Sequence, residues 1–146
     1  MDRRRLLQLA SFGALGLAGG GIGLWALGAN RRQPLPLKLG PLEDFPPGSA
    51  RILEAHGVLV HRSREGLAFI STRCTHLGCR VRLAGEQLLC PCHRGRFDLA
   101  GRPLGGPPTK RLPWLQGGVG AAGEVYLIVG RENRDRRRLP LGGAPR

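Results

Sequence analysis

The distribution of apolar residues divides the chain into two contrasting parts. An uncharged run extends without interruption from Leu6 to Asn30, directly after the charged stretch Asp2-Arg3-Arg4-Arg5. From about Glu43 onward, the apolar runs are short and alternate with turn-forming residues. A charged stub followed by a long uncharged run is typical of a targeting segment, whereas short runs separated by turns are typical of β-strands.

The second part is predicted to be all-β. Strands are expected at residues 57–61, 67–71, 80–83, 87–89 and 124–129. Glycine and proline residues separate these runs, and no long helical period follows residue 30. The totals of 24 Gly and 12 Pro likewise argue against a helical bundle.

The first part, residues 1–30, is predicted to be an export signal and a single transmembrane helix. As a helix, residues 6–29 would be about 36 Å long, which exceeds a hydrocarbon core of about 30 Å. Trp25 lies near the outer end, where interfacial aromatic residues are common. The paired arginines before Leu6 and Leu7 resemble a twin-arginine export signal. Cleavage at residues 26–28 remains an alternative to a retained anchor.

Two further segments flank the predicted head, which comprises residues 43–130. Residues 31–42 are expected to form a Pro-rich linker, since five prolines lie between residues 30 and 47. Residues 131–146 are expected to form a basic, flexible tail with too little apolar surface to pack. A head of about 90 residues has a small core, so we expect a covalent or metal crosslink.

The formal net charge of +13 initially suggests nucleic acid or an anionic membrane as a partner. Lys38 and Lys110 are the two lysines, so the other 21 basic residues are arginines. Three of these arginines belong to the predicted export signal. Because an exported head would not meet nucleic acid, we expect a membrane surface or an acidic redox partner instead.

All four cysteines and two of the four histidines lie in two boxes. The first box reads Cys74-Thr75-His76-Leu77-Gly78-Cys79, and the second reads Cys90-Pro91-Cys92-His93. Thirteen residues separate His76 from Cys90. Two thiolates and two imidazoles are suited either to a tetrahedral zinc ion or to a [2Fe–2S] cluster with two cysteines on one iron and two histidines on the other. The remaining histidines, at positions 56 and 61, are expected to be ordinary surface or packing residues.

The two boxes resemble those of the Rieske iron–sulfur protein family, in its disulfide-bearing branch from quinol-oxidising complexes. The resemblance covers about residues 43–130. It implies a head of stacked antiparallel sheets with a cluster-binding subdomain. It also implies that Cys74 and Cys90 bind one iron of a [2Fe–2S] cluster, that His76 and His93 bind the other, and that Cys79 and Cys92 form a disulfide.

Two further features acquire a role through this resemblance. Gly106-Pro107-Pro108 is similar to the proline loop that covers the cluster from a third side in this family. Leu77, next to the expected ligand His76, would be the apolar rim against which a quinol docks.

The residues just after the second box depart from the common family pattern at two positions. Gly95 stands where a serine usually donates a hydrogen bond to a bridging sulfide, and Phe97 stands where a tyrosine donates one to a cysteine ligand. Hydrogen bonds to sulfur favour the more negative, reduced cluster, so their loss should lower the reduction potential. We expect a low-potential carrier suited to a quinol such as menaquinol, and a higher potential in the double variant Gly95→Ser/Phe97→Tyr.

The function that the resemblance implies is one-electron transfer on the extracytoplasmic face of a membrane. A quinol would donate a proton to His76 or His93 and an electron to the cluster, and a c-type cytochrome or copper protein would accept the electron. A cytochrome b-type subunit would be required, so the chain would be an electron-transfer subunit rather than a complete enzyme. Two alternatives stay open: the Rieske subunit of an exported molybdenum enzyme such as arsenite oxidase, and a zinc-stapled interaction module on the membrane surface.

Overall fold

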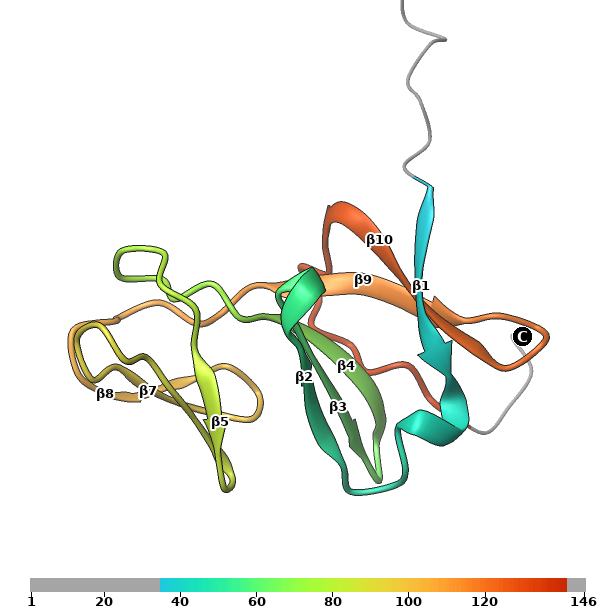
Figure 1. Cartoon of the computed structure of the whole chain (residues 1–146), viewed down its shortest axis with the longest axis horizontal. Helices are drawn as coiled ribbons and strands as arrows, with labels where there is room; N and C mark the ends of the chain where they lie inside the picture. Colours follow the sequence, from blue (N-terminus) through green and yellow to red (C-terminus); the bar gives the residue numbers. More distant parts are fainter. Residues whose placement is uncertain (1–34, 142–146) are drawn as a thin grey trace, which may run out of the picture. The chain divides into compact units, whose positions relative to one another are not determined.

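The computed structural model describes residues 35–141, and these residues form an all-β fold with two short 3₁₀ helices (Figure 1). The elements are β1 (Pro36–Pro41), η1 (Leu42–Asp44), β2 (Ala50–Leu53), η2 (Glu54–His56), β3 (Val58–Ser63), β4 (Gly66–Ser71), β5 (Arg82–Ala84), β6 (Gln87–Leu89), β7 (Arg96–Asp98), β8 (Pro103–Gly105), β9 (Trp114–Val119) and β10 (Glu124–Glu132). The predicted export signal and transmembrane helix at residues 1–30 lie outside this range. Between residues 35 and 141, no helix has the length and apolar character needed to cross a membrane.

The strands form two antiparallel sheets. The larger sheet has the order β1-β10-β9-β4-β3-β2, and the smaller sheet has the order β5-β6-β7-β8. The smaller sheet is a simple meander inserted in the sequence between β4 and β9, two neighbouring strands of the larger sheet. In Figure 1 its strands, coloured from yellow-green to gold, lie to the left of β2, β3 and β4. The chain therefore leaves the larger sheet once, builds the smaller sheet, and returns.

Strand β4 and the first half of β3 are buried on both faces, which explains why residues 58–60 and 67–70 are continuous hydrophobic runs in the sequence. Along β3, Val58 and Val60 pack into one buried cluster, whereas Leu59 between them packs into another. On β4, Phe69 and Ile70 divide between the same two clusters. This alternation follows from the two-residue period of a strand. The cluster that contains Leu59 and Ile70 also contains Cys74, Cys90 and Phe97, so one core supports both sheets.

The segment predicted to be a linker differs in the structure. Residues 36–41 form β1 and pair with β10, with an irregularity in the register between Lys38 and Gly40. Leu37 and Leu39 pack against the core of the larger sheet. The prolines are compatible with this strand because β1 is an edge strand, where missing N–H donors are tolerated.

The segment predicted to be a loose tail also differs over residues 131–141. Strand β10 continues to Glu132, and Leu139 then forms an isolated antiparallel bridge with Leu67. The bridge has two backbone hydrogen bonds, of 3.0 Å from Leu67 N to Leu139 O and 2.8 Å from Leu139 N to Leu67 O. Leu139 and Leu141 pack against the buried core. These two leucines allow the segment to pack, although most of its residues are polar or charged.

Candidate metal centre

Three loops converge at one end of the smaller sheet, and they contain every candidate site residue except Phe97, which lies in β7. They are the β4–β5 loop with the first box, the β6–β7 loop with the second box, and the β8–β9 loop with Gly106-Pro107-Pro108. In an antiparallel meander, alternate connections lie at the same end of the sheet. The loops that enter β5, join β6 to β7 and leave β8 are therefore neighbours, although they span more than thirty residues of sequence.

The first box is held in a tight turn by its own backbone. The Cys74 N–H donates to the Cys79 carbonyl at 2.7 Å, and the Gly78 N–H donates to the Cys74 carbonyl at 2.9 Å. Gly78 has φ +81°, a conformation that glycine adopts without a steric penalty. The Thr75 hydroxyl donates to the Lys110 carbonyl at 2.6 Å and so ties this loop to the β8–β9 loop.

A backbone hydrogen bond also closes the loop of the second box. The Cys90 N–H donates to the Gly95 carbonyl at 2.7 Å. Arg94, just before Gly95, has φ +54°, which is uncommon for a residue other than glycine. Strained backbone of this kind is concentrated at functional sites, where surrounding contacts maintain it.

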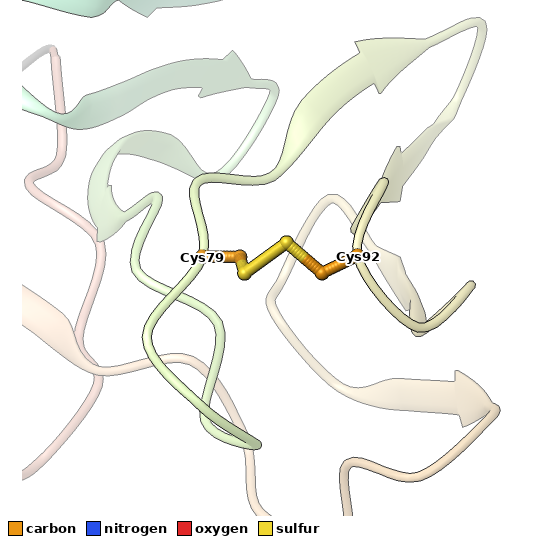
Figure 2. Close-up of a disulfide and its surroundings, with 2 residues drawn as sticks. All are labelled: Cys79 and Cys92. Carbon is orange, nitrogen blue, oxygen red and sulfur yellow. A yellow bond between two sulfur atoms is a disulfide. The ribbon is translucent and has the colours of Figure 1, made fainter.

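A disulfide between Cys79 and Cys92 joins the two boxes, as the resemblance implies (Figure 2). The S–S distance is 2.10 Å and the Cα–Cα distance is 6.6 Å. The Cys90 sulfur lies within 4.8 Å of both disulfide sulfurs. Since the two sulfurs of a disulfide are not thiolates, Cys90 is the one member of this trio able to bind a metal as a thiolate.

The two remaining cysteines are free thiols on the inner side of the boxes. Cys74 and Cys90 are each 3% exposed and belong to the buried core. Burial raises the pKa of the Cys74 thiol, and the neighbouring Cys90 thiol raises it further. The backbone N–H of His76 donates a hydrogen bond to the Cys74 sulfur and lowers the pKa of Cys74 in part. The buried Cys74 thiol therefore prefers to stay protonated unless a metal cation binds there and deprotonates it.

The two imidazoles lie on the outer side of the boxes. His76 and His93 have ring centroids 4.8 Å apart with the rings nearly perpendicular, at 88°. Both His76 and His93 are exposed. Leu77, beside His76, is 69% exposed. Neither His56 nor His61 joins this group, since they lie in η2 and β3.

The Gly106-Pro107-Pro108 loop packs directly on the second box. A Cβ atom built on Gly106 would lie 2.9 Å from the Arg94 carbonyl oxygen, and Gly106 has φ +85°, so a larger residue is excluded there. Pro108 is buried against Gly95, whereas Pro107 is exposed. This loop therefore covers the second box from the side of β8.

The same contact gives a steric reason for Gly95. A Cβ atom at position 95 would lie 2.6 Å from Pro108 Cγ and 3.5 Å from Cys90 Cβ. A serine would thus require Pro108 to move, so Gly95 is more than a missing hydrogen-bond donor. Phe97 is fully buried in the cluster that contains Cys74 and Cys90. The contact between Gly95 and Pro108 and the hydrogen bond from Thr75 to Lys110 carry no signal in the sequence.

The arrangement fits a [2Fe–2S] cluster of mixed ligation. Two free thiols lie on the buried side and two imidazoles on the outer side of loops that a disulfide holds together. This donor set of two sulfurs and two nitrogens is the one that such a cluster takes when histidines replace two cysteines on one iron.

Comparisons with known proteins agree with this chemistry. The family model described as the Rieske [2Fe-2S] domain matches residues 36–116. The chain is 41% identical over 76 residues to a carotenoid phi-ring synthase of Chlorobaculum tepidum, an alignment that covers 49% of this chain and 11% of that protein. It is 44% identical over 70 residues to a cytochrome bc1 complex Rieske iron-sulfur subunit of Streptomyces lividans, covering 44% of this chain and 40% of that protein. The chain therefore spans well under half the length of these two relatives.

A solved structure extends the similarity to the fold. A chain in the structure described as a hyperthermophilic respiratory Complex III aligns with a TM-score of 0.50 and 25% identity, over 82% of this chain and 98% of that chain. The family match spans more than half of the chain, and it includes both boxes, the proline loop and the start of β9. The chain therefore belongs to the Rieske [2Fe–2S] domain family, and its cofactor is a [2Fe–2S] cluster.

Proposed function

We propose that this chain is the Rieske electron carrier of a cytochrome bc-type complex, where it takes one electron from a quinol and passes it to a c-type cytochrome or copper protein. The observation that carries the proposal is the two-sided site: a pair of buried thiols, with a pair of imidazoles and an exposed leucine on the outer side. Similarity to the bc1 Rieske subunit and to a chain of a respiratory Complex III supports this role.

In this proposal Cys74 and Cys90 hold one iron, and His76 and His93 hold the other. When bound, the cluster supplies a one-electron redox centre. The buried thiols lie in the core, where apolar packing excludes water from the sulfur side. The imidazoles lie on the outer side, where a quinol hydroxyl can reach them, so one ring nitrogen accepts the hydroxyl proton as the quinol is oxidised.

Leu77 gives the quinol an apolar surface next to these imidazoles. Its side chain is 69% exposed, so it is free to contact the apolar part of a quinol whose hydroxyl reaches the neighbouring imidazole. The Gly106-Pro107-Pro108 loop restricts access from the opposite side, because it packs on the second box. The pocket would be completed by a cytochrome b-type subunit.

We further propose that residues 1–30 export and anchor this chain, with the head on the extracytoplasmic side. The support is the sequence alone: two arginines before two leucines, followed by an uncharged run of sufficient length. The disulfide between Cys79 and Cys92 is consistent with an oxidising compartment.

Ligation is tested by electron paramagnetic resonance of the full chain after reduction with dithionite. We expect a [2Fe–2S] signal that is lost in His93→Ala and in Cys74→Ser. A matched variant, His56→Ala, removes an exposed histidine outside the boxes and should retain the signal. Iron-free protein, or an unchanged signal in His93→Ala, would contradict the ligand assignment.

The partner is tested separately, by purifying the chain from its native membrane in mild detergent. Copurification with a b-type haem subunit and oxidation of quinol by the complex would support the proposal. Copurification with a molybdenum-containing subunit would instead favour the carrier of an exported molybdenum enzyme.

A further inference from the structure

A second polar site lies around Trp114, outside the cysteine–histidine boxes. A cleft of about 840 Å³ is lined by Trp114, Ala100, Pro140, one glutamate and five arginines, namely Arg102, Arg111, Arg136, Arg137 and Arg138. An adjoining cleft of about 400 Å³, which Trp114 also lines, adds Arg134 and Glu132. The arginines come from the β7–β8 turn, the β8–β9 loop and the segment after β10, so the fold gathers them from separate parts of the chain.

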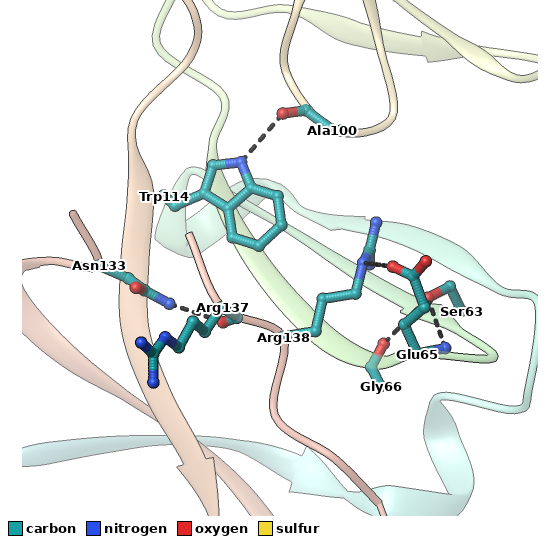
Figure 3. Close-up of polar contacts among 8 residues, drawn as sticks. All are labelled: Ser63, Glu65, Gly66, Ala100, Trp114, Asn133, Arg137 and Arg138. Atoms are coloured by element: carbon teal, nitrogen blue, oxygen red, sulfur yellow. Dashed lines mark hydrogen bonds and ion pairs between the residues drawn. The ribbon is translucent and has the colours of Figure 1, made fainter. Parts of the chain in front are cut away.

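The segment that supplies three of these arginines is held in place by hydrogen bonds. The Arg136 N–H donates to the Asn133 carbonyl at 3.1 Å, and the Asn133 side-chain amide donates to the Arg137 carbonyl at 2.8 Å (Figure 3). The bridge between Leu139 and Leu67 fixes the end of the segment. Arg136 has φ +51°, a conformation that costs free energy for a residue with a side chain. The arginines are therefore displayed on a fixed turn.

Arg138 lines this cleft with a largely buried side chain. Its guanidinium carbon lies 5.5 Å from the centre of the Trp114 ring, and the Trp114 N–H donates to the Ala100 carbonyl at 2.9 Å (Figure 3). The Arg138 side chain is 13% exposed, and its Nε lies 3.2 Å from a carboxylate oxygen of Glu65. Its Nη1 is buried and has no hydrogen-bond acceptor among residues 35–141. A buried charged donor without an acceptor is costly, so this group favours an anion in the cleft.

The charge of the cleft is compensated poorly by the protein. Glu65 is the one acidic residue that lines it, against five arginines, and its side chain is 82% exposed. An exposed carboxylate in water gives a weak ion pair. Several guanidinium groups around one concave surface match the oxygen geometry of a phosphate group, because arginine donates in a bidentate manner. The volume leaves room for a ligand larger than a single phosphate.

We propose that this arginine-lined cleft binds a phosphate-bearing anion, either a free phosphorylated molecule or the headgroup of an anionic phospholipid. None of the residues that line the larger cleft belongs to the two cysteine–histidine boxes. The site is therefore separate from the electron-transfer site, and its test does not depend on the proposed function.

The test compares two variants of the full chain in neutral detergent, each of which removes three exposed arginines. R102Q/R111Q/R137Q removes cleft arginines, and R51Q/R64Q/R82Q removes the same charge elsewhere on the surface. Titration calorimetry measures binding of pyrophosphate and of dioctanoyl phosphatidylglycerol, with dioctanoyl phosphatidylcholine as a headgroup of no net charge. Circular dichroism checks that each variant is folded; if the cleft triple variant does not fold, R137Q replaces it and R64Q becomes its control.

We expect the cleft variant to bind at least one anionic probe about tenfold or more weakly, since it loses charge-assisted hydrogen bonds, which are stronger than neutral ones. The control variant should bind as the unmodified chain does. Loss of pyrophosphate binding would indicate a free phosphorylated ligand, and selective loss of phosphatidylglycerol binding would indicate a headgroup. Equal weakening in both variants, or no binding of either anionic probe to the unmodified chain, would overturn the proposal.

Discussion

The hydroxyl of Thr75 donates a 2.6 Å hydrogen bond to the backbone carbonyl of Lys110, which connects the first cysteine–histidine box to the β8–β9 loop. The loop that contains Lys110 also carries Pro108, which packs against Gly95 of the β6–β7 loop. With the disulfide between Cys79 and Cys92, these contacts connect all three loops in a closed ring. Each link in the ring can be broken separately.

Thr75→Val should loosen the β8–β9 loop without changing the side-chain volume much. We expect the free energy of unfolding to fall by about 1 kcal/mol, the usual contribution of one hydrogen bond. Thermal unfolding followed by circular dichroism measures the change. Thr109→Val removes an exposed hydroxyl from the same loop and serves as the control. Equal melting temperatures for the Thr75→Val variant and the unmodified chain would show that this hydrogen bond does not stabilise the site.

Removing the disulfide with C79S/C92S should destabilise the site strongly. The two cysteines are 13 residues apart, and closing a loop of about 15 residues contributes about 3 kcal/mol in the chain-entropy description. We expect a lower melting temperature and faster loss of the cluster's visible absorbance on heating. Reductant should reproduce this effect in the unmodified chain and have no further effect on C79S/C92S. A variant as stable as the oxidised chain would contradict the structural role of this bond.

Phe97→Tyr should raise the reduction potential of the cluster. The new hydroxyl would lie in the core next to Cys74 and Cys90, where a hydrogen bond to sulfur favours the reduced state. If this bond favours reduction by about 1.4 kcal/mol, the midpoint rises by about 59 mV for one electron. Redox titration measures the shift, and Tyr126→Phe, in the larger sheet, is the control.

The Phe97→Tyr variant is a cleaner test than one that also introduces serine at position 95. A side chain at Gly95 would push against Pro108, so a change in potential could come from the displaced loop instead of a new donor. A midpoint unchanged in Phe97→Tyr would contradict the idea that the missing tyrosine hydroxyl makes this a low-potential carrier.

Leu77→Ser should impair quinol oxidation and leave the cluster intact. Leu77 is 69% exposed, so the change removes an apolar contact surface without disturbing the core. Losing the burial of a leucine against a ligand costs about 1.5–3 kcal/mol, or about tenfold to a hundredfold in kcat/KM for the quinol. The paramagnetic resonance signal should be retained. Leu104→Ser, at another exposed leucine, is the matched control; equal rates in both variants would place quinol docking elsewhere.

His61 should make the stability of the head depend on pH. Burial, chiefly, and the positive charge of Arg138 hold the pKa of His61 below its ordinary value of 6.5, against the backbone of Leu99 and the Asp98 carboxylate. The unfolded chain therefore binds more protons below pH 6.5, and the free energy of unfolding falls as the pH drops from 6.5 toward the lowered native pKa. Urea unfolding at several pH values measures this fall.

The contribution of His61 is isolated by a pair of glutamine variants. His61→Gln should lose part of the fall in stability below pH 6.5, whereas His56→Gln, at an exposed histidine, should retain it. The two variants differ from each other at positions 56 and 61 alone, so contributions from the rest of the chain cancel in the comparison. If the two variants show the same pH dependence, His61 does not contribute to the acid sensitivity.

A strand of this fold can be predicted from the sequence where the hydrophobic pattern lies within its own residues. Runs within β3, β4, β5, β6 and β10 are recognisable because their own residues alternate or are continuously apolar. Strands β7 and β8 have three residues each and contain Arg96 and Pro103, so no local pattern distinguishes them from loops. β1 forms because β10 offers hydrogen-bonding groups and a core surface for Leu37 and Leu39, and neither is visible within residues 36–41.

The sequence by itself determined the donor chemistry of this protein. Two boxes with two cysteines and a histidine each restrict the cofactor to a metal or an iron–sulfur cluster, and their family resemblance predicts the disulfide between Cys79 and Cys92, which the structure confirms. That information is local, because the identity and spacing of ligands within each box are covalent properties of a short segment.

Only the tertiary structure decided what surrounds those boxes. The packing of Pro108 on Gly95, the hydrogen bond from Thr75 to Lys110, and the assembly of arginines around Trp114 all join residues that are far apart in the chain. The physical reason is that an antiparallel meander fixes which loops are neighbours. The amino-acid composition of one loop does not indicate which other loop it contacts. The arginines that are merely abundant in the sequence become a specific site because β10 and the bridge from Leu139 to Leu67 place them on one surface.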